Sequence, residues 1–450
     1  MKGISNYILI TGLFLAILSA CDSINVEPEK ERIFVKMYGG EQKEEGIDVK
    51  QLSDGGYIVL GNSYSNFGGQ FGGQDIIVIR TDSEGNELWR KRIGTPGFDE
   101  GKELKLDDSE NIYVVGSFGM NNGSKLGQIT KLSIAGDIIN QTTFGDSTHV
   151  YRFNSTEIFG DFLFVTGESS NVFPKSSQTA ADSLDFILLA YNRNDLSFYD
   201  IKYEGFSGID QAVSILRTGI EKDVNEDFEK IRIEVLANVS RTTADGLNAA
   251  TGDFFFTLDD FTIQTGGTAG FVPVKGNVSG YFMAKKALRK SPNGDEYFFI
   301  ANYLTSLSDV TSEQSIVLFS KGKGTDPVFL DDLPFSGGGI SSGEGITYFP
   351  SISTSNKVVV ATTTNAYSDA QSNTDILINS YEAGAVLSEN TDWNSTPRLH
   401  GFNSNDRAGN IIQSSDGGLV LVGTIGFDDQ IESSNTMICL IKTNPNGFVE

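Results

Sequence analysis

Short runs of apolar residues, or of alternating apolar and polar residues, recur along the chain, and each is bounded by Gly, Asp, Asn or Ser. In the clearest copy, four runs follow one another at 47–53, 54–61, 75–80 and 87–94. Runs of this length and pattern predict β-strands. Four strands per repeat, with repeats tens of residues apart, are typical of a β-propeller blade. The pattern therefore predicts an all-β protein built as a propeller.

Seven copies of the four-strand pattern can be laid out along the chain, and the last copy lacks its fourth strand. The segment 32–40 matches the fourth strand of the first copy, 87–94. If this segment pairs with the last copy, the ring closes and the ends of the chain leave no unpaired strand edge there. We therefore predict a seven-bladed β-propeller whose last blade is closed by the N-terminal strand. Six or eight blades are also compatible with the pattern, because the fourth and fifth copies are poorly marked.

The N-terminal residues predict a sorting signal. Lys2 precedes an apolar stretch, 7–18, that is too short to favour a permanent membrane span. The next residues, Leu-Ser-Ala-Cys at 18–21, resemble a bacterial lipobox, which implies that Cys21 carries acyl chains such as palmitate and becomes the new N-terminus. An ordinary signal peptide is the alternative. The predicted organisation is a lipoprotein signal peptide at 1–20, an acidic tether at 21–31 and the propeller domain at 32–450.

Three elements of the first repeat, 54–61, the strand led by Asp75 and 82–89, resemble the repeats of β-propeller lipoproteins from Bacteroidetes-type bacteria. Residues 416–423 repeat the first of these elements. The resemblance implies a seven- or eight-bladed ring held on an outer membrane by its lipid anchor, on either the periplasmic or the outer side. It implies no shared activity.

Net charge argues about binding partners, and cysteine content argues about disulfides. The net charge of −25 comes from 59 acidic and 34 basic residues. It argues against nucleic acid as a partner, because phosphate binding requires clustered Lys and Arg. With Cys21 lipidated, the other cysteine of the chain is Cys439, so no disulfide is expected. Cys439 lies in an apolar run and is predicted to be a small core residue.

The loops that join the second and third strands of each repeat are long in all seven copies. Strand polarity alternates within a blade, so these loops share one face, and their length suggests a binding surface. Aromatic rings exposed there can stack on sugars or anchor a protein partner; the alternative is that they fold back and cap the ring. The aromatic residues of these loops are Tyr64, Phe67, Phe71, Phe118, Phe173, Tyr303, Tyr367 and Phe427.

One acidic segment has a spacing that suits calcium, because side chains bearing oxygen alternate along it. These side chains belong to Asp223, Asn225, Asp227 and Glu229. The segment lacks the glycine that an EF-hand type of loop requires at its sixth position, so an acidic solvated insertion is the alternative. No other cofactor is predicted. The two histidines, His149 and His400, are too few for a zinc site with three histidine ligands.

Two further patterns carry weaker chemical signals. Residues 339–343 fit Gly-x-Ser-x-Gly, but the strand-turn-helix setting of a nucleophile elbow is not predicted there. An aspartate precedes the third strand of several repeats, which favours a structural role such as accepting backbone N–H bonds. These aspartates are Asp75, Asp185, Asp253 and Asp375.

The features together favour a lipid-anchored, non-enzymatic propeller of the cell envelope that binds a glycan or an envelope protein through its long-loop face. The alternative is a glycan-active enzyme, either a lyase or a glycoside hydrolase, with carboxylates at the mouth of the ring. Asp428 and Asp429 form one candidate pair of acids. The two hypotheses differ in whether several carboxylates, Arg and Tyr converge on the central channel.

Overall fold

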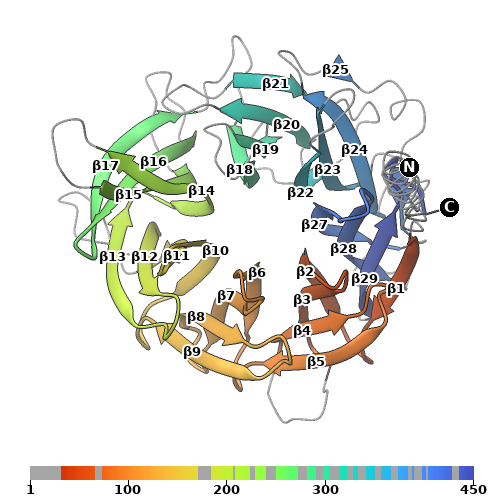
Figure 1. Ribbon diagram of the computed structural model, residues 1–450, viewed down its shortest axis with the longest axis horizontal. Helices are drawn as coiled ribbons and strands as arrows, with labels where there is room; N and C mark the ends of the chain where they lie inside the picture. Colours follow the sequence, from red (N-terminus) through yellow and green to blue (C-terminus); the bar gives the residue numbers. More distant parts are fainter. Residues whose placement is uncertain are drawn as a thin grey trace, which may run out of the picture.

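The computed structural model is a ring of β-sheets around a common centre (Figure 1). Every regular element in the described residues is a strand, which confirms the all-β prediction. The structure describes residues 32–65, 73–170, 184–205, 208–222, 229–239, 250–271, 281–289, 297–304, 314–321, 328–332, 341–349, 356–365, 373–383, 388–389, 398–401, 404–427 and 435–449.

Within the described residues the strands form seven antiparallel sheets, which run outward from the centre of the ring. The first three sheets are β2 to β5 (Glu44–Gln51, Tyr57–Ser63, Asp75–Thr81, Glu87–Ile93), β6 to β9 (Glu100–Leu106, Ile112–Gly119, Lys125–Leu132, Ile138–Phe144) and β10 to β13 (Tyr151–Phe159, Phe162–Ser169, Asp185–Asn192, Phe198–Glu204).

The next three sheets are β14 to β17 (Gln211–Lys222, Glu229–Val239, Ala250–Asp259, Thr262–Phe271), β18 to β21 (Tyr281–Arg289, Tyr297–Leu304, Gln314–Lys321, Val328–Asp332) and β22 to β26 (Ser341–Phe349, Asn356–Thr364, Asp375–Ala383, Ser388–Glu389, Arg398–His400). In this sixth sheet both β25 and β26 pair with β24. The seventh sheet contains β27 (Arg407–Gln413), β28 (Leu419–Gly426), β29 (Thr436–Thr443) and β1 (Phe34–Tyr38).

β1 joins the two ends of the chain in one sheet. It pairs antiparallel with β29, with Phe34 opposite Lys442 and Met37 opposite Cys439. Figure 1 shows β1 as the outermost strand of this sheet, beside the first sheet of the ring. The Tyr38 side chain is 5% exposed and its hydroxyl donates a 2.6 Å bond to the carbonyl of Gly85. β1 therefore bridges the last sheet and the first.

The second and third strands of the first, third and last sheets are almost wholly buried. Every residue of β3 and of β28 is buried. Hydrophobic clusters fill the spaces between sheets, as where Phe186 of β12 lies 4.7 Å from Phe254 of β16 between ring centroids. Strands covered on both faces need nearly continuous apolar sequences, and each large side chain buried in this way contributes roughly 1.5–3 kcal/mol. Cys439 is free and buried in this core, as predicted.

Side-chain oxygens and amides also link successive sheets near the centre. The Asn62 side chain of β3 accepts a 2.8 Å bond from the N–H of Gly101 in β6 and donates to its carbonyl. Asn238 of β15 makes the same pair of bonds with Ala284 of β18, at 2.9 and 3.0 Å. These buried backbone groups would otherwise lack partners, so the bonds fix the spacing between neighbouring innermost strands.

A change of register occurs in the innermost strand of each of the seven sheets. The pairing of β2 with β3 shifts between Gly46 and Asp48, and that of β6 with β7 shifts between Gly101 and Glu103. The same shift recurs in β10, β14, β18, β22 and β27. A bulge of this kind adds one residue to a strand and bends it. The repeat of the fold is thus kept even in the copies that are poorly marked in sequence.

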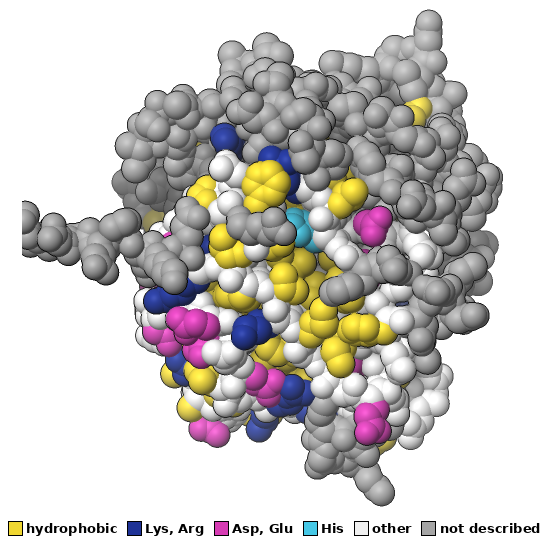
Figure 2. Space-filling model, turned by 90° about the vertical axis from the view of Figure 1, so that its right-hand side faces the viewer, with side chains coloured by type: hydrophobic (Ala, Val, Ile, Leu, Met, Phe, Trp, Pro, Cys, Tyr) yellow, Lys and Arg dark blue, Asp and Glu magenta, His cyan; other side chains and the backbone are white. Residues whose placement is uncertain are grey.

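Figure 2 shows the side of the ring where β1 and β29 lie, and hydrophobic side chains gather on it. Val35 of β1 and Leu399 of β26 are 45% and 40% exposed. Phe448, which follows β29, is 40% exposed and its ring lies 3.7 Å from the Arg398 guanidinium. None of the described residues belongs to a helix long and apolar enough to cross a membrane.

Candidate functional site

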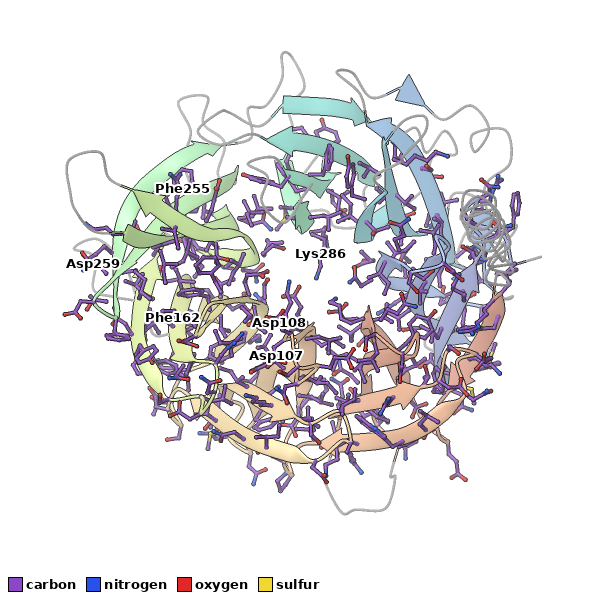
Figure 3. The ribbon with its side chains drawn as sticks, viewed as in Figure 1. Asp107, Asp108, Phe162, Phe255, Asp259 and Lys286 are labelled. Atoms are coloured by element: carbon purple, nitrogen blue, oxygen red, sulfur yellow. The ribbon has the colours of Figure 1, made fainter. Side chains whose placement is uncertain are left out.

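A cavity of about 620 Å³ lies at the centre of the ring. Its walls are the first halves of the innermost strands of all seven sheets and the last parts of β11, β15, β19 and β28. Innermost strands begin where the links between sheets arrive, so the cavity opens on the face that carries the long loops. Figure 3 shows side chains that point into this centre, Lys286 among them.

The bulges supply a ring of side chains to this cavity. Because a bulge interrupts the alternation of a strand, it re-aims a side chain that the regular pattern would place elsewhere. The bulge residues of all seven innermost strands line the cavity, and they are Ile47, Lys102, Asn154, Val213, Lys285, Glu344, Gly409 and Asn410. The inner wall of the ring is thus made from seven separate parts of the sequence.

Charged side chains dominate the polar part of this wall. The carboxylate of Glu168 accepts a 2.5 Å bond from the Arg152 guanidinium, and Lys102 lies 2.5 Å from Glu100. The Arg407 guanidinium is 3.9 Å from the nearest oxygen of Glu45, and its side chain is 61% exposed. The cavity therefore presents both carboxylates and cations to whatever enters it.

An ion pair crosses the centre of the ring below the mouth of the cavity. Lys286 of β18 donates a 3.1 Å bond to Glu103 of β6, and Figure 1 shows these two strands on opposite sides of the ring. Burial alone would raise the pKa of Glu103, but Lys286, the neighbouring lysines Lys105 and Lys50, and the Thr156 N–H lower it to about 2. Glu103 is therefore ionised at neutral pH and holds Lys286 in place.

Glu344 is a carboxyl of the cavity wall with a raised pKa. Burial raises the pKa of Glu344 above its ordinary value, and the nearby Lys285 and Arg407 only partly offset this shift. The charge of Glu45 adds to the upward shift. A carboxyl that stays protonated to a higher pH can donate a proton to a leaving group. Glu344 is thus the candidate acid of this site.

Aromatic side chains lie on the same face as the mouth. Tyr64 meets Phe98 edge to face, with centroids 6.0 Å apart, and the Lys125 ammonium lies 5.0 Å from the centre of the Phe98 ring. Phe98 is 42% exposed and Phe427 is 50% exposed. Phe98 was not among the predicted aromatics because it lies in a link between sheets rather than in a long loop.

Other predicted aromatics lie elsewhere or outside the described residues. The expectation that Phe118 lies in a loop was wrong: β7 continues to Gly119, and Phe118 is 6% exposed in a hydrophobic cluster. Tyr303 belongs to β19 and is half-buried, 5.3 Å from the Phe282 ring between centroids. The remaining four, Phe67, Phe71, Phe173 and Tyr367, lie outside the described residues, as does the lipidation site Cys21.

Most residues of the predicted metal and catalytic motifs lie outside the part of the chain that the structure describes. Asp223, Asn225 and Asp227 of the calcium segment lie outside the described residues, and Glu229 begins β15. In the described part of the chain, no three His, Cys, Asp or Glu side chains come together as a metal site. Asp428 and Asp429 also fall outside it. Of the Gly-x-Ser-x-Gly motif, residues 341–343 begin β22, where the N–H of Gly343 bonds to Asn302.

The two histidines have different surroundings. His149 is exposed and its Nδ1 lies 2.9 Å from the carboxylate of Asp146. His400 ends β26, and its Nε2 is 3.2 Å from the carbonyl of Gly447. Burial lowers the pKa of His400. Neither histidine lines the central cavity.

Of the aspartates before the third strands, Asp75 and Asp185 are buried and Asp375 is half-buried. In two of the sheets a second aspartate accepts the backbone N–H bonds. Asp75 is fully buried and forms an ion pair with Arg92. Asp99, in the link that follows, accepts the N–H of Gly119 at 2.8 Å. Asp406 accepts the N–H of Gly426 at 2.9 Å in the same way. The capping role expected for Asp75 is thus performed by the aspartate of the following link.

No protein-family model matches the sequence. No curated protein matches it either. Solved structures do resemble the fold. An ulvan lyase, a polysaccharide lyase solved in complex with -[GlcA(1-4)Rha3S]-, aligns with a TM-score of 0.50 and 11% identity, over 91% of this chain and 96% of that one.

Two other similar structures are more distant. The N-terminal domain of Nup159 aligns with a TM-score of 0.40 and 10% identity, over 91% of this chain and 96% of that chain. An α-L-arabinofuranosidase from Fusarium graminearum aligns with a TM-score of 0.39 and 10% identity, over 92% and 98% of the two chains. The sheet topology and the likeness to the ulvan lyase show that this chain has a β-propeller fold.

Proposed function

We propose that the chain forms a closed seven-bladed propeller, held on the outer membrane of a bacterial cell envelope through a lipid on Cys21. The seven sheets, and the pairing of β1 with β29, support the closed ring. The lipobox at 18–21 supports the anchor, since several acyl chains on one residue give stable membrane attachment. Mass spectrometry of the mature N-terminus would test this part; an unmodified Cys21 would contradict it.

We further propose that this propeller is a glycan-active enzyme whose site is the central cavity. The observation that carries the proposal is Glu344, a carboxyl with a raised pKa on the cavity wall beside a second carboxyl, Glu45. Two carboxyl groups in different environments are what glycoside hydrolysis needs. The ulvan lyase with a similar fold was solved bound to a glycan, and we bring glycans to this chain as the proposed class of substrate.

In the proposed reaction, water adds across a glycosidic bond. The protonated Glu344 gives its proton to the oxygen of the leaving sugar while the bond from the anomeric carbon to that oxygen breaks. Glu45, as carboxylate, takes the proton of the attacking water or bonds to the anomeric carbon first. One water molecule is consumed for each glycosidic bond that is cleaved.

The turnover rate of the Glu344→Gln variant tests this proposal. The wild-type protein and the variant would be assayed on aryl glycosides and on envelope and algal polysaccharides, by release of reducing ends and by absorbance of unsaturated products. We expect the variant to lose at least about 100-fold in kcat, as for loss of a general acid, while binding stays within a few fold. Glu84→Gln, on the exposed outer rim, is the matched control. Full turnover by Glu344→Gln would overturn the assignment.

The second candidate function is a module that binds glycans without turnover. The exposed aromatic side chains favour this function. Tyr64, Phe98 and Phe427 lie in connections on the face where the cavity opens, and a sugar ring could stack on them. Glycan binding that Phe98→Ala weakens, together with no product from any substrate, would select this function over the enzyme.

A further inference from the structure

The side chains that line the central cavity include more cations than carboxyl groups, whereas the whole chain is acidic. The whole chain carries a net charge of −25. The cavity is lined by three carboxyl groups, Glu45, Glu168 and Glu344, and by five cationic groups, Lys102, Arg152, Lys285, Lys286 and Arg407. A concave surface lined with an excess of one charge concentrates the field and attracts ligands of opposite charge. The contrast identifies the cavity as the place where an acidic protein would receive an anion.

Two of these cations are free to meet a ligand. Lys285 is exposed, and it makes no ion pair with any residue that the structure describes. Arg407 is 61% exposed and lies 3.9 Å from Glu45, a separation at which an exposed pair contributes about 0–1 kcal/mol. Both side chains can therefore turn toward a ligand at little cost. They stand on β18 and β27, so a ligand that reaches both spans part of the mouth.

The other three cations hold fixed positions around them. Arg152 is bound to Glu168, Lys102 to Glu100 and Lys286 to Glu103. Each of these pairs is neutral overall, but it holds an N–H donor in a fixed position, so the side chain does not have to reorganise when a ligand binds. Burial keeps Glu344 protonated to a higher pH than usual, which removes part of the negative charge that would repel an anion.

We propose that the cavity binds an anionic glycan, one that carries carboxylate or sulfate groups, through Lys285 and Arg407. The inference deepens the glycan-active function proposed above and rests on the same cavity. Each charged group on the ligand would accept hydrogen bonds from an ammonium or a guanidinium, which are stronger than bonds between neutral groups. Increasing salt weakens such contacts because it screens exposed charges.

Calorimetric titration of the full-length protein tests the inference. The probes are dextran sulfate, polygalacturonate and unmodified dextran, each at low and at high sodium chloride. We expect one or both polyanions to bind, with affinity falling as salt rises, and dextran to bind at least tenfold more weakly. Binding of only dextran sulfate would identify sulfate as the recognised group, and binding of only polygalacturonate would identify carboxylate; both support the inference. Dextran binding as tightly as the polyanions would overturn it.

The variant Lys285→Gln/Arg407→Gln localises the contact. We expect it to weaken polyanion binding at least tenfold. The matched control, Lys91→Gln/Lys202→Gln, removes two cations from the outermost strands β5 and β13 and changes the net charge equally. Equal weakening by both pairs would show a general charge effect and overturn the site. Binding without turnover would leave this inference standing while the proposed enzymatic function fails.

Discussion

The Thr424 hydroxyl accepts a 3.0 Å hydrogen bond from the backbone N–H of Gly46, a residue 378 positions earlier in the chain. The contact joins β28 of the last sheet to β2 of the first. Thr436 makes a second contact of this kind, accepting the N–H of Glu44 at 2.9 Å. The ring is therefore joined at its inner wall by side chains of the last sheet, and at its outer wall by β1.

Replacing Thr424 by Val should weaken this join. Valine has the same shape but no hydroxyl, so the buried N–H of Gly46 would lose its acceptor. Leaving a buried donor unpaired costs about 1–3 kcal/mol, which chemical denaturation would measure. Thr143→Val in β9 is the matched control, because Thr143 is exposed. Equal stability of the two variants would show that the contact contributes nothing.

Deleting 32–40 should destabilise the protein by more than a single contact does. The deletion removes β1, uncovers the edge of β29 and opens the cluster that includes Tyr38 and Val420. An uncovered strand edge also promotes association between molecules. We expect a lower Tm and an increase in apparent size by gel filtration. Deleting 22–31, which precedes the strand, is the control, and an unchanged Tm for the longer deletion would contradict closure by β1.

Replacing Lys442 by Met should cost about 3 kcal/mol, because it leaves one charge of a buried pair uncompensated. The Lys442 side chain is 1% exposed, and its ammonium lies 2.9 Å from the Asp416 carboxylate. Burial would raise the pKa of Asp416, but bonds from Ser414, Lys442 and Gly418 lower it below the ordinary value. The stabilisation is therefore present above the unfolded pKa and is lost as pH falls through the folded one.

The difference in unfolding free energy between wild type and Lys442→Met should accordingly shrink as the pH is lowered below about 4. Adding Asp416→Asn should recover part of the loss at neutral pH, because it removes the unpaired carboxylate. A difference that stays constant with pH would mean that packing of the lysine, rather than its charge, stabilises the fold.

We expect the contribution of Asp75 to the free energy of unfolding to fall as the pH rises. Burial raises the pKa of Asp75 to about 6, against the opposing effect of Arg92 and with the support of Asp99. The folded state then binds a proton more tightly than the unfolded state between pH 4 and 6, so this group's contribution is present at low pH and is lost as pH rises through 6. Relative to Asp75→Asn, the wild-type Tm should decline over this range. Parallel curves would contradict the assignment, and carbon NMR of the carboxyl would measure its titration directly.

The strand pattern of the first and last repeats was enough to predict the fold class, because repeats of four strands, tens of residues apart, are typical of propeller blades. The partner of the N-terminal strand followed from the match between 32–40 and 87–94. Phe118 was misplaced because a strand that continues past its glycine leaves no local signal. The presence of an aromatic residue in a long loop also does not show whether its side chain is exposed to solvent.

The site could not be predicted because bulges have no fixed residue type. The positions equivalent to Lys102 hold Ile47, Asn154 and Glu344 in other sheets. A partial signal exists, since Gly46 and Gly101 both precede a bulge and an acidic residue follows it. The raised pKa of Glu344 depends on groups from three sheets, which no local stretch of sequence brings together.

The ion pair between Lys286 and Glu103 ties together two strands, β18 and β6, that lie across the ring from each other. A brace of this kind resists widening of the ring. If the two sheets moved apart, the bond would break and two partly buried charges would be left without compensation.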